Sequence, residues 1–236
     1  MSIRENVDLV RGKIRAAALA AGRDPDSITL VAATKVQSSD TIREAIAAGI
    51  TCCGENRVQE FTAHWSDGAY DGAKVHFIGH LQRNKVKYLV GKVDLIESVD
   101  KRSLLEEIDR RAQKLGLVQD ILLEVNVAGE LSKSGVAPEA LDELLAAAAV
   151  LPGVRVRGLM AIPPIAVSPG GNVEYFQRMH QLFIDIRGKM TDNRSCVDIL
   201  SMGMCGVFED AVACGATQVR VGTALFGARP PQRAQG

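Results

Sequence analysis

The sequence has few aromatic residues, no net charge and no apolar run long enough to span a membrane. Phe, Trp and Tyr make up 4% of its 236 residues, which disfavours a β-sandwich and favours helices packed on strands. Its 28 basic and 28 acidic residues cancel, so no overall field attracts nucleic acid or an anionic membrane. Residues 1–6 contain no apolar signal core, and no stretch approaches the roughly 18 apolar residues of a membrane span. We therefore expect a cytoplasmic protein with neither nucleic-acid nor membrane partners.

Metal-binding and disulfide patterns are also missing from the sequence. The cysteines are odd in number and none are spaced as C-x-x-C; they are Cys52, Cys53, Cys196, Cys205 and Cys214. This pattern disfavours zinc and a disulfide framework, and it favours a reducing cytosol. His76 and His80 lie four residues apart, but across an expected strand-to-loop junction and not on one helix face. The sequence predicts no metal site.

Eight short apolar segments alternate with segments of helical periodicity, after one extra helix that a Ser2–Glu5 capping box begins. The strand-like segments are residues 28–35, 50–53, 75–78, 93–97, 120–127, 154–160, 197–201 and 218–221. Such alternation predicts parallel strands with right-handed crossovers. A count of eight favours a closed (β/α)8 TIM-type barrel over an open doubly wound sheet. We expect one domain over residues 1–236, with residues 228–236 as a loose tail.

The carboxyl ends of the strands carry most of the polar candidates for a site, because all strand-to-helix loops of a barrel open on one face. The residues expected there are Lys35, Asn56, His80, Ser98, Asn126, Met160, Ser201, Gly203, Arg220, Gly222 and Thr223. Lys35 ends the uninterrupted apolar run 28–34, although a lysine can simply mark where a strand reaches water. Ser201, Gly203, Gly222 and Thr223 are small enough for backbone N–H groups to approach an anion, although turn glycines and a helix cap look the same.

Arg220 lies inside an apolar strand, so it either points into the barrel as a buried cation that needs a partner or makes an ordinary surface contact. A lysine and a phosphate site on one barrel mouth suggest an aldehyde phosphate cofactor held as a Schiff base. A class I aldolase would use the same two features. A protein-interaction barrel without a cofactor is a third interpretation, which leaves Lys35, Arg220 and the glycines as coincidences.

Several segments, taken in order along the chain, resemble the pyridoxal phosphate homeostasis proteins, also called the YggS-like or PROSC-like family. They are residues 31–35, 54–60, 76–85, 124–135, 157–163, 200–204 and 219–227. The resemblance implies a barrel like that of alanine racemases, with pyridoxal 5'-phosphate as a Schiff base on Lys35. It implies Ser201, Gly222 and Thr223 near the phosphate, Arg220 near the pyridine nitrogen, and Asn56 and Met160 along the ring.

The chain departs from the family pattern after the glycine that follows the seventh strand. Cys205 stands where the family usually has a serine that could cap the next helix, and Val207 stands where it usually has an aspartate. Loss of a good helix cap costs about 1 kcal/mol. The detail of the phosphate pocket on this side is therefore open.

The same resemblance leaves a choice between a cofactor carrier and a racemase. A racemase on this barrel needs a second acid–base group facing the lysine, usually a tyrosine from an added β domain, and about ten residues follow the last strand's loop. Tyr70, Tyr88 and Tyr175 are expected in a loop or on outer helices, away from the mouth. Arg220 beside the pyridine nitrogen would keep the ring a poor electron sink. We expect a monomeric carrier that delivers cofactor to apoenzymes without efficient catalysis and has no catalytic residues; a racemase is the alternative.

Overall fold

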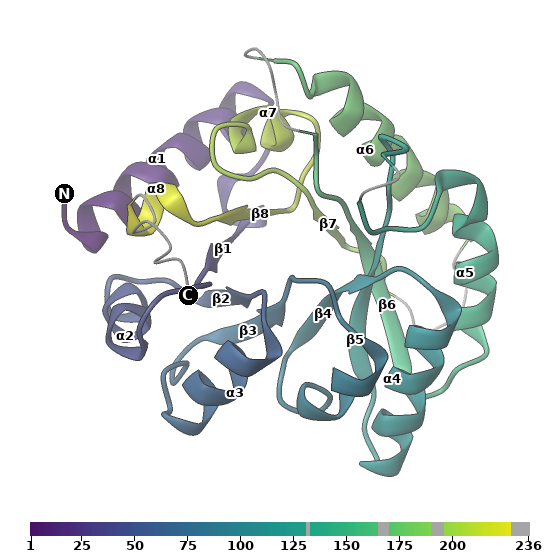
Figure 1. The fold of residues 1–236 in the computed structure, drawn as a ribbon. Coiled ribbons are helices and arrows are strands. Elements are labelled where there is room, and N and C mark those ends of the chain that lie inside the picture. The colour runs from purple at the N-terminus through teal and green to yellow at the C-terminus, as the bar shows by residue number, and fades with distance from the viewer. Residues whose placement is uncertain (131–132, 165–169, 190–195, 228–236) are drawn as a thin grey trace, which may run out of the picture.

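Eight parallel strands close into a barrel in the order in which they occur in the chain (Figure 1). The computed structural model describes residues 1–130, 133–164, 170–189 and 196–227. The strands are β1 (Thr29–Ala33), β2 (Cys52–Glu55), β3 (Lys74–Phe77), β4 (Leu95–Val99), β5 (Gln119–Glu124), β6 (Val154–Met160), β7 (Ile199–Ser201) and β8 (Gln218–Val221). Because β1 pairs with β8 as well as with β2, the sheet has no free edge. The predicted (β/α)8 barrel is confirmed, and the open sheet is wrong.

The α-helices surround the barrel, as Figure 1 shows. They are α1 (Ile3–Ala20), α2 (Ser39–Ala47), α3 (Val58–Ser66), α4 (Arg102–Lys114), α5 (Leu141–Ala149), α6 (Val173–Lys189), α7 (Phe208–Ala213) and α8 (Thr223–Phe226). Three 3-10 turns, η1 (Pro25–Ser27), η2 (Arg83–Tyr88) and η3 (Pro138–Ala140), lie between them. The crossover between β3 and β4 is therefore a 3-10 turn where the sequence predicted a short helix.

Helix α1 is the extra helix that precedes the barrel. Its predicted capping box is present, since the Ser2 backbone N–H donates to Glu5 and the Glu5 N–H donates to the Ser2 hydroxyl. The helix packs against α7 and α8, the last helices along the chain. The Asn6 side chain donates to the carbonyl of Leu225 at 2.9 Å, and Arg23 donates to the carbonyl of Val212 at 2.6 Å. The first helix thus covers the seam at which the barrel closes.

The strands bury both of their faces, as their apolar composition predicts. On β1, Leu30 and Ala32 join the large core between barrel and helices. A second, smaller cluster contains Leu95, Leu122 and Met160 and lies apart from that core. Because side chains alternate along a strand, Val31, Ala33 and Lys35 share the opposite side of β1 from Leu30 and Ala32.

Strand β5 ends earlier than the predicted segment 120–127. After Glu124 the chain folds back, so that the N–H of Val136 donates to the carbonyl of Glu124 at 2.8 Å. The N–H of Asn126 donates in turn to the carbonyl of Val136 at 2.9 Å. The N–H of Val125 still donates to the carbonyl of Met160 at 2.8 Å, so the contact with β6 extends one residue past the strand.

Within the described ranges, no helix combines the length and the apolar character needed to cross a bilayer. The expected loose tail, residues 228–236, lies outside the described residues. That the whole chain forms one domain stays a prediction.

Candidate functional site

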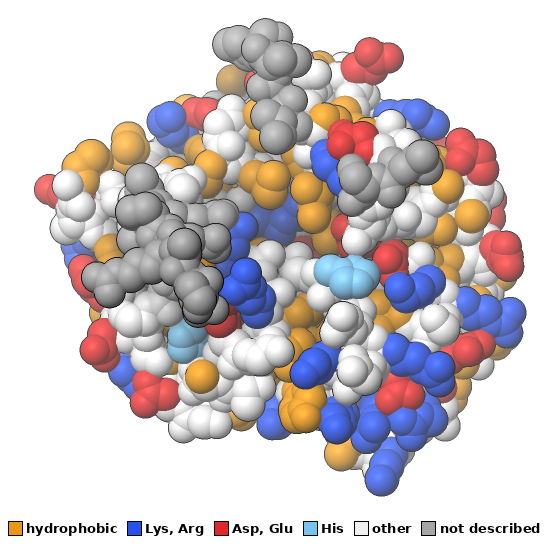
Figure 2. All heavy atoms as spheres, viewed as in Figure 1, with side chains coloured by type: hydrophobic (Ala, Val, Ile, Leu, Met, Phe, Trp, Pro, Cys, Tyr) orange, Lys and Arg blue, Asp and Glu red, His pale blue; other side chains and the backbone are white. Residues whose placement is uncertain are grey.

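A cavity of about 390 Å³ opens at the carboxyl ends of β1, β2 and β8. Its walls are Ala33, Lys35, Gln37, Asn56, Ile78, Ile162, Met204, Cys205, Arg220, Gly222, Thr223, Phe226 and Gly227. Figure 2 shows a hollow near the middle of the face in view, with Lys or Arg side chains at its wall. Of the predicted site residues, the structure brings Lys35, Asn56, Arg220, Gly222 and Thr223 together around this cavity.

Lys35 reaches the cavity because the chain turns sharply just after β1. The N–H of Thr34 still donates to the carbonyl of Gly54 at 2.9 Å, so Lys35 follows directly on the last ladder bond. The next residue, Val36, has φ of 60° and is the one non-glycine residue with positive φ in the described part of the chain. A β-branched residue in that region is strained by roughly 1–3 kcal/mol. Its N–H is held by the carboxylate of Glu60 at 2.9 Å.

A buried carboxylate behind β1 supports this turn, and no pattern in the sequence predicted it. Glu55 is fully buried, and its Oε1 atom accepts from the Thr34 hydroxyl at 2.6 Å and from the Tyr70 hydroxyl at 2.9 Å. The Nδ1 atom of His64 lies 3.2 Å from the same oxygen. Burial, followed by the charge of Glu55, raises the pKa of the Tyr70 hydroxyl, which therefore stays a donor. Thr34, the neighbour of Lys35, is thus fixed from outside the barrel.

Arg220 points into the barrel, so the first of its two interpretations holds. Its guanidinium lines the cavity and donates to the carbonyl of Ala161 at 2.8 Å and to the hydroxyl of Ser201 at 2.5 Å. The carboxylate of Glu97 lies 3.9 Å away. Burial lowers the pKa of Arg220, and the charges of Glu97 and Glu124 oppose that shift. The buried cation has the partners that the sequence analysis required.

Glu97 lies at the centre of a polar network inside the barrel, between β3, β4, β7 and β8. Its Oε1 accepts from the Gln218 amide at 2.6 Å and lies 2.8 Å from Nδ1 of His76, and its Oε2 accepts from the Ser201 hydroxyl at 2.6 Å. Burial would raise the pKa of this carboxyl, but the bonds and charges of His76, Arg220 and Ser201 outweigh burial and lower it. Glu97 is therefore a charged group in a sealed interior. A carboxylate in an apolar strand was the one sequence signal for it.

Six of the residues expected at the mouth do not line this cavity, namely His80, Ser98, Asn126, Met160, Ser201 and Gly203. Two of them, Ser201 and Met160, carry an expected role toward the cofactor. The hydroxyl of Ser201 is bonded to Glu97, Gln218 and Arg220 within the network. Met160 is fully buried and packs with Leu95 and Leu122 inside the barrel. The roles expected for both residues, phosphate contact and ring contact, stay predictions.

The loop after β7 and the start of α8 form one end of the cavity. The N–H of Gly222 donates to the sulfur of Cys205 at 3.2 Å. Burial alone would raise the pKa of the Cys205 thiol. Hydrogen bonding to the Thr223 hydroxyl and to the N–H groups of Ala224, Gly222 and Thr223 outweighs burial, so the net pKa lies below the ordinary value. Several donors thus converge on one electron-rich atom. The same donors could serve an anion.

The structure shows where Cys205, the residue that departs from the family pattern, lies. Helix α7 begins after Val207, which makes no side-chain cap, and Cys205 turns away from that helix toward α8. Gly203, two residues earlier, has φ of 89°, and a Cβ there would lie 2.5 Å from the Cβ of Ala211. The loop therefore needs glycine at 203 and carries a thiol into the cavity at 205.

Asn56 contributes an unsatisfied acceptor to the same cavity. Its side-chain oxygen is buried and has no hydrogen-bond partner among the described residues. The backbone of Asn56 is fixed by Gly79, where a Cβ would lie 2.0 Å from the Asn56 carbonyl oxygen. Buried acceptors are almost always bonded, so this oxygen fits a ligand that brings a donor.

Tyr175 corrects one expectation from the sequence. Helix α6 carries it to the rim of the cavity, where its hydroxyl donates to the carbonyl of Ile162 at 3.2 Å, and Ile162 is part of the wall. The prediction that this tyrosine lies away from the mouth is wrong. Burial raises the pKa of its hydroxyl, and Arg220 opposes that rise. The phenol is neutral, and its proton is committed to a carbonyl.

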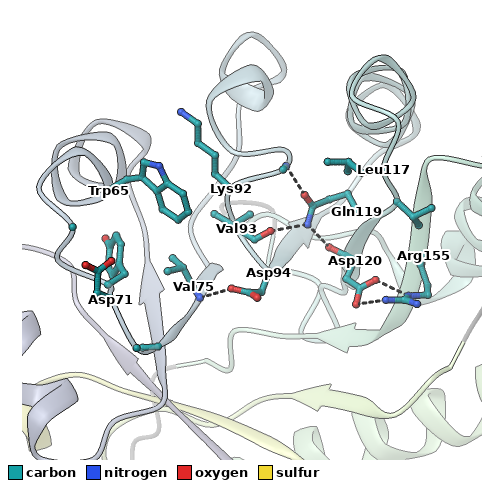
Figure 3. A pocket seen from close by; sticks show the side chains of 16 residues that line it. Trp65, Asp71, Val75, Lys92, Val93, Asp94, Leu117, Gln119, Asp120 and Arg155 are labelled. Atoms are coloured by element: carbon teal, nitrogen blue, oxygen red, sulfur yellow. Dashed lines mark hydrogen bonds and ion pairs between the residues drawn. The ribbon is translucent and has the colours of Figure 1, made fainter.

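A larger hollow of about 580 Å³ lies at the amino ends of β3 to β6, at the opposite end of the barrel (Figure 3). Its polar groups bind one another. Asp94 accepts from the N–H of Val75 at 2.8 Å, Gln119 bonds three backbone groups, and Arg155 pairs with Asp120 at 2.6 Å. Catalytic and binding sites of such barrels lie at the carboxyl face. We therefore place the site at the smaller cavity. In the described part of the chain, no group of three or more His, Cys, Asp or Glu side chains could hold a metal ion.

Comparison with known proteins adds sequence relatives over nearly the whole chain. The family described as "Alanine racemase, N-terminal domain" matches residues 3–230. A pyridoxal phosphate homeostasis protein of Aquifex aeolicus is 43% identical over 229 residues, which cover 97% of this chain and 99% of that protein. The protein of the same name from Escherichia coli K12 is 40% identical over 231 residues, or 96% of this chain and 97% of that one.

Solved structures agree with the fold. The structure of PipY from Synechococcus elongatus with PLP bound superposes with a TM-score of 0.83 at 33% identity, over 96% of this chain and all of that one. An alanine racemase of Clostridium difficile superposes with a TM-score of 0.76 at 13% identity, over 98% of this chain and 57% of that one. The second likeness is one of fold alone.

Proposed function

The chain belongs to the family of pyridoxal phosphate homeostasis proteins, and from this premise we propose that it binds pyridoxal 5'-phosphate as a Schiff base on Lys35. One observation carries the proposal: Lys35, Arg220, Gly222 and Thr223 meet in a single cavity of about 390 Å³. That volume lies within the range of small-molecule sites, about 300–1,000 Å³. The bound cofactor would supply a reactive aldehyde joined to an electron-withdrawing ring.

The residues present fit this cofactor. Lysine amines form Schiff bases with aldehydes, and Lys35 lines the same cavity as Arg220. The donors that converge on Cys205 suit the phosphate, with Gly222 and Thr223 as its binding residues. The unpartnered oxygen of Asn56 suits a donor group of the ligand. Ser201 serves this site through Arg220, and we keep its direct phosphate contact and the ring contact of Met160 as proposals.

We further propose that the protein holds and delivers the cofactor without efficient turnover. A guanidinium has donors and no acceptor, so Arg220 repels a proton on any nitrogen it faces and leaves the ring a poor electron sink. Tyr175, the tyrosine at the rim, is neutral and bonded to a carbonyl, so it is a poor proton acceptor. With a poor electron sink and a neutral phenol in Tyr175, storage and transfer to apoenzymes are the best-supported use. We place this role in a monomer in the cytosol, where the five free cysteines stay reduced.

Borohydride reduction of the protein reconstituted with pyridoxal phosphate, followed by peptide mapping, tests the assignment. We expect a yellow protein, a label on Lys35, and loss of both in Lys35→Ala. Lys92→Ala, a lysine at the opposite hollow, is the matched control and should keep colour and label. A label on another lysine, or a colourless protein after cofactor addition, contradicts the proposal.

Transfer is measured by mixing the loaded protein with a pyridoxal-phosphate-dependent apoenzyme and following the recovery of that enzyme's activity. Racemisation of alanine at about 1 per second or faster, within the ordinary enzyme range, and lost in Lys35→Ala, would replace the carrier by a racemase. Borohydride trapping of a sugar substrate without added cofactor would instead support the aldolase.

A further inference from the structure

Glu97 is a buried carboxylate that does not line the cavity and yet lies beside Arg220, which does. It lies in β4, with no exposed surface, and Arg220 of the cavity wall is 3.9 Å from its Oε2. The same Oε2 accepts the Ser201 hydroxyl at 2.6 Å. The proposed binding role does not by itself explain why a carboxylate is buried inside the barrel at this position.

The hydrogen bonds around Ser201 have a fixed direction. A serine hydroxyl has one proton, and here it goes to Glu97 at 2.6 Å. The lone pairs of the same oxygen are therefore free to accept from Arg220 at 2.5 Å and from Gln218 at 2.9 Å. If Glu97 lost its charge, the Ser201 hydroxyl could donate its proton elsewhere, and its oxygen would no longer be held as an acceptor for the guanidinium of Arg220.

Glu97 is itself held on its other oxygen. Oε1 accepts the Gln218 amide at 2.6 Å and lies 2.8 Å from Nδ1 of His76. The carboxylate thus has bonded partners on both oxygens and a cation beside one of them, as a stable buried charge requires. Arg220 has a complementary need, because a fully buried guanidinium without a counter-charge would be strongly destabilising.

We propose that Glu97 is the positioning residue that fixes the guanidinium of Arg220 at the cavity wall, both by its charge and through the hydroxyl of Ser201. His76 and Gln218 hold Glu97 in place for this task. The identity of the ligand rests on the proposed function, whereas the coupling of Glu97 to Arg220 does not. We therefore expect Glu97→Gln to lower the ligand affinity only while Arg220 is present.

A double-mutant cycle with Glu97→Gln, Arg220→Met and the double variant separates positioning from mere structural support. Pyridoxal phosphate is titrated into each protein and followed by visible absorbance. We expect Glu97→Gln to weaken binding about tenfold, within the coupling range of directly contacting residues. In the Arg220→Met background the same substitution should cause no further loss, because no guanidinium remains to be positioned.

The same cycle is measured on the cofactor-free proteins by urea unfolding. Each single variant leaves one buried charge without its partner, whereas the double variant removes both charges. We expect the urea midpoint to fall in each single variant and to rise again from Arg220→Met to the double variant. This measurement needs no ligand, so it tests the pair even if the protein binds no pyridoxal phosphate.

Glu107→Gln is the matched control, because Glu107 is a largely buried carboxylate paired with Arg110 and Arg111 on α4, outside the barrel. It should lower the urea midpoint and leave affinity unchanged. Equal losses of affinity from Glu97→Gln in both backgrounds, or strictly additive urea midpoints, overturn the proposal. A wild-type protein that forms no visible band overturns the proposed function instead, while the unfolding cycle still decides on Glu97.

Discussion

Glu124 should make the cofactor-free protein less stable as the pH rises. It ends β5 and is buried within the field of Asp100 and Arg220. Burial, and then the charge of Asp100, raise its pKa from 4.5 to about 7, and Arg220 offsets only part of this. A carboxyl whose pKa is raised by folding favours the folded state while it is protonated there. Its contribution is therefore complete below about pH 4.5 and disappears as the pH rises through about 7.

The size of the effect follows from the two pKa values. A rise from 4.5 to about 7 corresponds to about 3 kcal/mol, since each pH unit is worth about 1.4 kcal/mol. In Glu124→Gln the side chain stays neutral at every pH, so this loss is absent. Any change in hydrogen bonding of the new amide is an offset that does not change with pH.

Urea unfolding of the cofactor-free wild type and of Glu124→Gln, at about pH 4.5 and about pH 8, measures the difference. We expect the wild type to lose about 3 kcal/mol of unfolding free energy relative to the variant between these two values. Glu107→Gln is the control, because the bond to Arg110 outweighs burial and lowers the pKa of Glu107 below 4.5, so its contribution is lost only at pH values below this window. A gap between wild type and Glu124→Gln that does not change with pH would refute the reasoning.

Three further outcomes test the cavity. Thr223→Ala should weaken pyridoxal phosphate binding by about 1–2 kcal/mol, typical of a hydrogen bond to a charged group; an absorbance titration measures it, and equal affinity for pyridoxal without phosphate would refute the phosphate assignment. Iodoacetamide should alkylate Cys205, because its N–H donors lower the pKa of the thiol, and bound cofactor should slow that reaction. Peptide mass spectrometry measures the rate, and equal rates with and without cofactor would show that the ligand lies elsewhere. Tyr175→Phe should leave alanine racemisation at background, and any racemisation by the wild type that this variant loses would make Tyr175 a catalytic base.

The elements and their order could be read from the sequence because each depends on local pattern. Residues 154–160 and 218–221 were predicted with the bounds that β6 and β8 have. Lys35, Asn56, Gly222 and Thr223 were predicted together because they follow strands, and a barrel places all strand ends on one face. Arg220 was left with two interpretations, since alternation defines two sides without saying which is the interior.

The polar network could not be predicted, because it joins residues that are far apart in the chain. Glu97 meets Ser201 and Gln218 only when β4 faces β7 and β8 across the barrel. The pairing of β4 with β5 also shifts register between Ile96 and Val99, so simple alternation fails there. Tyr175 was misplaced for a similar reason, because its bond to the carbonyl of Ile162 joins α6 to the residues after β6, and no local pattern predicts that contact.

Closure of the barrel by β1 and β8 sets the order in which a newly made chain can acquire its site. Lys35 leaves the ribosome early, but Thr29 must wait for Gln218 before the sheet can close. Arg220 and the Gly222–Thr223 loop are synthesised long after Lys35. A chain interrupted before β8 would carry Lys35 without Arg220 or the loop that we propose for the phosphate. If Lys35 holds the aldehyde as proposed, only a chain made through β8 and its loop would have the complete site.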